Sequence, residues 1–138
     1  MKYFEDLTNY SYLYHENSKN IGWLDNSYSY QKGTVSQEFM DKLWIYLNVK
    51  INLVRGFNNC SLCPVEYKRD SEATYNGESI RLGFAEIRVL GEDGSTLYAA
   101  PDLIYHYIID HEYVPPKEFI QAVLKGPKPD SSEYKKFL

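Results

Sequence analysis

Residues 65–99 alternate between apolar and polar side chains, and this period of two separates stretches that have helical periodicity. Within them, Asn76-Gly77 predicts a tight hairpin, because a type I′ turn needs positive φ at both central residues. Glu86 and Arg88 alternate with apolar neighbours, so we expect one face of the sheet to be polar. The pattern predicts an antiparallel meander of three to four strands, at about 72–75, 78–83, 85–90 and 95–99.

Three amphipathic segments predict about three helices around this meander. Ser36 is a natural N-cap for a helix over residues 37–48, in which apolar residues recur at helical spacing. Pro101 stands at the favoured first position of a second helix, which the pair Pro115-Pro116 would end. A third helix is expected from near Pro116 to Gly126.

The two ends of the chain lack such periodicity. Residues 1–35 are rich in Asn, Ser, Tyr and Gly and predict an irregular arm that wraps the domain, whereas residues 127–138 are polar and predict a frayed tail. A chain of 138 residues has the length of one domain, so we expect a single domain over residues 1–126. Helices segregated from an antiparallel sheet are typical of the α+β class.

Charge and hydropathy argue against several classes of function. Fifteen Lys and Arg residues stand against nineteen Asp and Glu, a net charge of −4, whereas nucleic-acid binding needs a concentrated positive field. No apolar run approaches the ~18–20 residues of a membrane span. The sequence of residues 1–6 is too acidic for a secretory signal. We therefore expect a cytoplasmic protein that binds neither nucleic acid nor membrane.

Four thiol and imidazole side chains are candidate metal ligands. Cys60 and Cys63 form a Cys-x-x-Cys pair on a predicted turn, and the second predicted helix carries His106 and His111 near its end. Zinc prefers such a tetrahedral set, and four protein ligands leave no open position, so we predict one structural zinc ion. Residues i and i+5 lie about 140° apart on a helix, so His111 would have to lie past the helix end.

Other interpretations of these residues stay open. The cysteines could be buried thiols, with His106 near the helix surface and His111 a favourable group at the helix C-terminus. A redox pair is less favoured, because Pro64 and a predicted strand follow the second cysteine where a helix would be expected. A zinc-dependent enzyme is a further alternative. The sequence contains no nucleophile elbow, phosphate loop or dinucleotide fingerprint, so an enzyme is not favoured.

Several motifs follow one another in a specific order along the chain. They are Gly22-Trp23-Leu24-Asp25, Arg55-Gly56 ahead of Cys60-Ser61-Leu62-Cys63-Pro64, Gly83-Phe84-Ala85-Glu86-Ile87-Arg88-Val89, and Tyr98-Ala99-Ala100-Pro101-Asp102-Leu103-Ile104-Tyr105-His106-Tyr107 followed by His111, Tyr113, Pro115-Pro116 and Phe119. This order resembles a family of small uncharacterised bacterial proteins, over about residues 3–124. Members of that family tend to carry a histidine where this chain has Asn58-Asn59. The resemblance favours convergence of the four candidate ligands and implies no particular activity.

Small, acidic, single-domain bacterial proteins without catalytic motifs are often immunity proteins, which bind and block a toxin. By this analogy we expect an immunity-type protein whose partner is a bacterial toxin domain. Fourteen tyrosines, six of them in the first thirty residues, suit such binding, because Tyr offers a rigid contact area with a polar tip. The predicted contact residues lie in the irregular arm, where loops carry function, and are Glu16, Asp25, Tyr28 and Tyr30.

Overall fold

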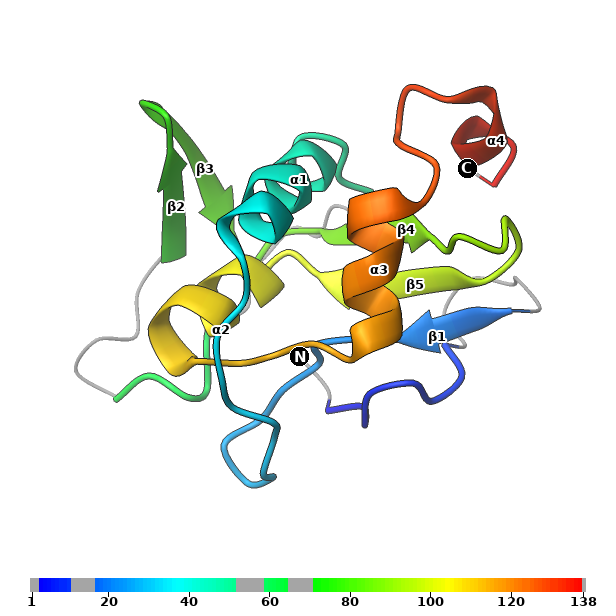
Figure 1. Ribbon diagram of the computed structural model, residues 1–138. Helices are drawn as coiled ribbons and strands as arrows, with labels where there is room; N and C mark the ends of the chain where they lie inside the picture. Colours follow the sequence, from blue (N-terminus) through cyan, green and yellow to red (C-terminus); the bar gives the residue numbers. More distant parts are fainter. Residues whose placement is uncertain (1–2, 11–16, 52–58, 65–70, 138) are drawn as a thin grey trace.

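The computed structural model describes residues 3–10, 17–51, 59–64 and 71–137. These residues form four helices and five strands in two small sheets, which confirms the α+β class (Figure 1). In chain order the elements are β1 (Ser18–Asn20), α1 (Gln37–Leu47), β2 (Ser71–Tyr75), β3 (Glu78–Leu82), β4 (Glu86–Leu90), β5 (Leu97–Pro101), α2 (Ile104–His111), α3 (Lys117–Lys125) and α4 (Ser132–Lys135).

The strands form two sheets, so the expectation of one continuous meander is wrong. β2 and β3 pair antiparallel around Asn76-Gly77, as the turn predicts. β4 and β5 also pair antiparallel, and β5 pairs on its other edge with β1, in parallel. The chain bends between β3 and β4 at Gly83, where φ is 98°, and Glu86 at the start of β4 bridges to Ile51. The arm is therefore not wholly irregular, since it supplies the edge strand β1.

Helices α1 and α3 pack together and against β4 (Figure 1). α1 begins where the sequence predicts, because Ser36 Oγ accepts a hydrogen bond from the Phe39 amide at 3.1 Å. The ring of Phe39 meets that of Phe119 in α3 edge to face, with centroids 6.3 Å apart. Both rings are fully buried, and burial of aromatic surface on this scale is a main source of core stability.

The end of α3 lies very close to β4. Gly126 follows α3, as predicted, and a Cβ there would overlap the carbonyl oxygen of Leu90 and approach that of Ala122 to 2.6 Å. Only glycine permits backbones to come this near. The glycine therefore sets how closely the helix packs on the sheet.

Helix α2 starts later than predicted, because Pro101 is the last residue of β5 and the helix begins at Ile104. Between them, Asp102 is 1% exposed and accepts hydrogen bonds from the amides of Gly83 at 2.7 Å and Phe84 at 3.3 Å. Its carboxylate also pairs with Lys50 Nζ at 3.0 Å. Asp102 therefore holds the bend between β3 and β4, in addition to preceding a helix.

The expected polar face of the sheet is buried. Glu86 and Arg88 do share one face, but Arg88 is only 2% exposed and pairs with Glu86 at 2.9 Å. The guanidinium lies 4.6 Å from the ring centroid of Tyr10 and donates a hydrogen bond to its hydroxyl at 3.0 Å. Trp23 completes this cover, donating its indole N–H to the carbonyl of Ala99 at 3.0 Å. The N-terminal arm, instead of solvent, therefore covers this face.

The C-terminal segment is ordered, so the expectation of a frayed tail is wrong. It folds into the short helix α4, whose N-cap Ser131 accepts a hydrogen bond from the amide of Tyr134. Tyr134 is 1% exposed and donates its hydroxyl to the carbonyl of Arg88 at 2.8 Å. One aromatic residue in a polar segment thus docks that segment onto the sheet.

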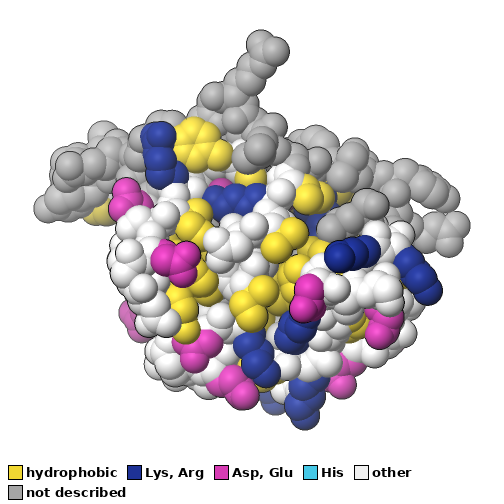
Figure 2. Space-filling model, turned by 90° about the horizontal axis from the view of Figure 1, so that it is seen from above, with side chains coloured by type: hydrophobic (Ala, Val, Ile, Leu, Met, Phe, Trp, Pro, Cys, Tyr) yellow, Lys and Arg dark blue, Asp and Glu magenta, His cyan; other side chains and the backbone are white. Residues whose placement is uncertain are grey.

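Figure 2 shows the molecule from above, where lysine, arginine, aspartate and glutamate side chains are interspersed around hydrophobic ones. Neither sign of charge dominates this face. Among the described residues, no helix has both the length and the apolar character needed to cross a bilayer.

Candidate metal centre

Two segments far apart in the sequence bring the four candidate ligands together. The turn at residues 59–64 carries Cys60 and Cys63, and α2 carries His106 in its first turn and His111 at its last position. Their four donor atoms all lie within 4.8 Å of one another. Cys60 is buried and the other three are partly buried, so the cluster lies just beneath the surface.

The distances within the cluster suit a tetrahedral metal ion. His111 Nε2 lies 3.4 Å from each of the two sulfur atoms, and His106 Nε2 lies 3.3 Å from Cys63 Sγ. Tetrahedral bonds of about 2.3 Å to sulfur and 2.0–2.1 Å to nitrogen place such atoms roughly 3.6 Å apart. These three separations are within a few tenths of an ångström of that value, and all four donor atoms lie within 4.8 Å of one another, so the cluster could hold a metal ion.

His106 is oriented by a carboxylate from its own helix. Asp110 Oδ2 lies 2.7 Å from His106 Nδ1, one helical turn along α2. A proton held on Nδ1 by this contact leaves the Nε2 lone pair free to point at the sulfur atoms. Metal-binding histidines commonly have such a carboxylate partner, which sets the tautomer and makes the ring more basic.

His111 is positioned by the end of the helix and by the arm. The sequence predicts that His111 lies just past the end of the helix, whereas in the structure it is the last residue of α2. Glu112 follows in the left-handed conformation, with φ of 57°, and turns the chain away. Tyr30 donates its hydroxyl to the carbonyl of His111 at 3.0 Å. The two imidazole rings lie with centroids 5.1 Å apart, so both reach the same side of the cluster despite their spacing.

Protonation of the cluster is set mainly by burial. Burial raises the pKa of the Cys60 thiol to about 11, so this thiol is protonated at neutral pH in the metal-free protein. Burial also lowers the pKa of both His106 and His111, against the opposing effect of Asp110. The imidazoles are therefore ready to bind a cation, whereas the buried thiol must first lose its proton.

The predicted partner-contact residues occupy different settings. Tyr28 is 53% exposed and stacks on Tyr3, with ring centroids 3.8 Å apart. Asp25 is half-buried, and its carboxylate accepts a hydrogen bond from the amide of Ser27 at 3.1 Å. Tyr30 is half-buried, and its hydroxyl donates the hydrogen bond to the backbone carbonyl of His111. Glu16 lies outside the described residues. Among the three of these residues that the structure describes, Tyr28 is the most exposed.

Sequence reasoning missed two residues beside the cluster. The i, i+4 spacing of His106 and Asp110 on one helix was an available signal for the carboxylate partner. Tyr107 is fully buried, and among the described residues its hydroxyl has no hydrogen-bond partner. Burial and then the nearby Cys60 raise the pKa of this phenol. No local pattern distinguishes it from the other core tyrosines.

Comparison with known proteins places the chain in a family. A family model described as a domain of unknown function, DUF7919, matches residues 2–124. No curated protein and no solved structure matches the chain. The matched range contains all four residues of the metal cluster and stops before α4. Because this family model matches most of the 138 residues, the chain belongs to the DUF7919 family.

Proposed function

We propose that the protein binds one zinc ion through Cys60, Cys63, His106 and His111, and that the ion has a structural role. The observation that carries this proposal is the convergence of two sulfur and two imidazole nitrogen donors within 4.8 Å. Thiolate and imidazole donors in a tetrahedral set are typical of zinc among the common cellular metals. The contact between Asp110 and His106 supports the same conclusion, because it orients a ligand.

The ion would fasten the turn at residues 59–64 to α2, through His106 near its start and His111 at its end. With four protein ligands, no coordination position is open for water or substrate, whereas a catalytic zinc keeps one. A closed set therefore favours a structural ion over a zinc-dependent enzyme. A cytoplasmic location belongs to this proposal, because free thiols persist in reducing compartments and both cysteines are free.

Native mass spectrometry of the purified protein tests the proposal. We expect one zinc ion per chain, and its loss in the variants Cys60→Ser and His106→Gln. His15→Gln is the matched control, because His15 is the remaining histidine of the chain and is not in the proposed ligand set. A protein that takes up no zinc when the metal is supplied, or a Cys60→Ser variant that keeps it, would show the proposal to be wrong.

We also propose that the protein binds a protein partner, in the manner of an immunity protein that occludes a toxin domain. The exposed ring of Tyr28, stacked on Tyr3 beside the exposed Glu5, supports this second function. The net charge of −4 suits a basic partner. Co-purification with the product of a neighbouring gene would support this role. If the protein protects cells from none of the toxins encoded nearby, this role is wrong.

A further inference from the structure

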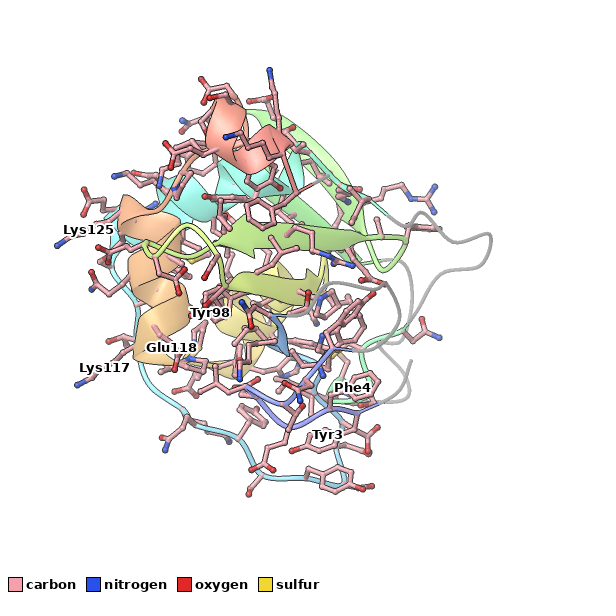
Figure 3. The ribbon with its side chains drawn as sticks, turned by 90° about the vertical axis from the view of Figure 1, so that its right-hand side faces the viewer. Tyr3, Phe4, Tyr98, Lys117, Glu118 and Lys125 are labelled. Atoms are coloured by element: carbon pink, nitrogen blue, oxygen red, sulfur yellow. The ribbon has the colours of Figure 1, made fainter. Side chains whose placement is uncertain are left out.

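A pocket of about 300 Å³ lies within the N-terminal arm and is lined by residues 3–6, Leu24 and residues 28–31. The four residues of the metal cluster do not line it. Figure 3 shows Tyr3 and Phe4 on this part of the molecule, away from Lys117 and Lys125 on α3. The described residues that line the pocket include no lysine and no arginine. Its aromatic and acidic lining residues are Tyr3, Phe4, Glu5, Asp6, Tyr28 and Tyr30.

Two carboxylates give this pocket a negative wall. Asp6 is partly buried and held in place, because Oδ1 accepts a hydrogen bond from the amide of Gly22 at 2.8 Å and Oδ2 accepts one from the hydroxyl of Tyr113 at 2.7 Å. Glu5 is next to it in sequence and is exposed. A carboxylate held at a concave surface attracts cations more strongly than one on an open surface, because the low-dielectric walls focus its field.

The aromatic rings add a second attraction for cations. Tyr3 and Tyr28 stack with an interplanar angle of 9°, and both rings line the pocket. Tyr3 and Tyr28 are the rings that matter for an incoming cation, because Lys32 Nζ already lies 5.4 Å from the centroid of Tyr30. The negative face of an aromatic ring favours positive charge, and Tyr is among the side chains that bind cations in this way.

We propose that this pocket binds the guanidinium group of an arginine side chain that a protein partner presents. A guanidinium is planar and can stack on an aromatic ring while it donates two parallel hydrogen bonds to a carboxylate, which an ammonium group does not do. The volume is at the lower end of the range for ligand pockets and fits one side chain. Free arginine fits less well, because the negative wall would repel its α-carboxylate, a charge that an arginine within a protein lacks.

The inference is independent of the zinc ion. It also gives a defined contact to the partner-binding role proposed above, and it is tested without any toxin. The probe is Nα-acetyl-L-arginine N-methylamide, followed by the shifts of the tyrosine ring signals in NMR titrations. The matched ligand is the same compound built on citrulline, which has the shape of arginine without its charge. Both titrations are run with zinc and after chelation, so that failure of one proposal does not imply failure of the other.

We expect the arginine compound to bind at least about tenfold more tightly than the citrulline compound, with shifts at Tyr3 and Tyr28. Glu5→Gln should weaken binding, whereas Glu92→Gln, at another exposed glutamate outside the pocket lining, should not. Tyr28→Leu should also weaken it, because leucine keeps the apolar bulk and loses the π face. Asp6 is not substituted, since its two hydrogen bonds hold the fold locally.

Equal binding of the arginine and citrulline compounds, or no binding at all, would overturn the proposal. The same holds if Glu5→Gln and Glu92→Gln have equal effects, because binding would then follow net charge and not this pocket. Tighter binding of free L-arginine than of the blocked compound would assign the pocket to a small molecule and would contradict the assignment to a protein side chain.

Discussion

Individual side chains in this protein act mainly through the partners that position them. Asp110 is an exposed carboxylate, yet its contact with His106 Nδ1 at 2.7 Å decides which nitrogen faces the cluster. Asp102 and Arg88, in contrast, are buried charges held by distant parts of the chain, Asp102 by Lys50 and Arg88 by Tyr10 of the arm in addition to Glu86 of its own strand. The two kinds of residue call for different measurements, one of metal affinity and one of stability.

Replacing Asp110 with asparagine should weaken zinc binding by about ten- to a hundredfold, because second partners of metal-binding histidines contribute on this scale. The amide can accept a hydrogen bond from Nδ1 but has lost the negative charge that makes the ring more basic. Competition with a chromophoric chelator measures the affinity. Asp130→Asn, at another exposed aspartate, is the control and should leave the affinity unchanged. Equal affinities in wild type and Asp110→Asn would contradict the role given to the carboxylate.

Replacing Asp102 with alanine should lower the free energy of unfolding by about 3 kcal/mol or more, because it removes a buried carboxylate that accepts hydrogen bonds from Lys50 Nζ and from two backbone amides. Lys50→Met should cost less, since Asp102 keeps its bonds to the amides of Gly83 and Phe84. Urea denaturation of the two variants measures the difference. If both variants lose the same amount of stability, Asp102 contributes through its ion pair with Lys50 and not through the bend between β3 and β4.

At the scale of elements, short segments at both ends of the chain complete the sheet. β1 adds a parallel strand to β5, and the neighbouring arm covers the face that carries Arg88. α4 docks through Tyr134. Each of these segments has only three or four residues in regular structure, so each depends on a tertiary contact for its stability.

Truncating Tyr134 to alanine should lower the free energy of unfolding by about 3 kcal/mol, as loss of a buried aromatic side chain does elsewhere. The hydrogen bond to the carbonyl of Arg88 is lost as well. Lys135→Ala, an exposed neighbour in the same helix, is the control and should change stability by less than about 0.5 kcal/mol. Chemical denaturation compares the two. A negligible loss in Tyr134→Ala would mean that the segment contributes nothing to the fold.

At the scale of the whole molecule, the cluster of candidate metal ligands brings together parts of the chain that lie far apart in sequence. Its four residues come from the turn at residues 59–64 and from α2, and Tyr30 connects α2 to the arm. The turn itself is tied to the arm, because Ser61 Oγ accepts a hydrogen bond from the amide of Asn26 at 3.1 Å. Binding of an ion at this junction should therefore stabilise the folded chain, because an ion that binds only the folded state shifts the unfolding equilibrium.

Zinc affinity should rise with pH. The pKa of Cys60 is raised to about 11, so below that value the metal-free protein holds a proton that the complex lacks. Each pH unit between about 7 and 10 should strengthen binding by at least about tenfold, and the zinc-dependent part of the stability should be lost as pH falls. Calorimetry in buffers of different ionisation enthalpy counts the released protons. Binding that releases no proton would contradict this account.

Much of the local structure was predictable from the sequence. The turn at Asn76-Gly77, the cap at Ser36 and the stop at Gly126 each depend on a few neighbouring residues whose backbone preferences are strong. The identity of the metal-ligand candidates was equally local, because few side chains offer sulfur or imidazole donors. The i, i+4 contact between His106 and Asp110 was within reach of the same reasoning.

The sequence by itself therefore determined the types and most of the boundaries of the elements between residues 37 and 126, and it identified the candidate ligands that the fold brings together. Only the tertiary structure decided which face of the sheet is covered, that Arg88 and Asp102 are buried, and that β1 and α4 complete the fold. The physical reason is the range of the interactions. A cap or turn depends on the φ and ψ preferences of adjacent residues, whereas burial of a charge depends on which distant segment supplies its partner, and periodicity alone does not encode that choice.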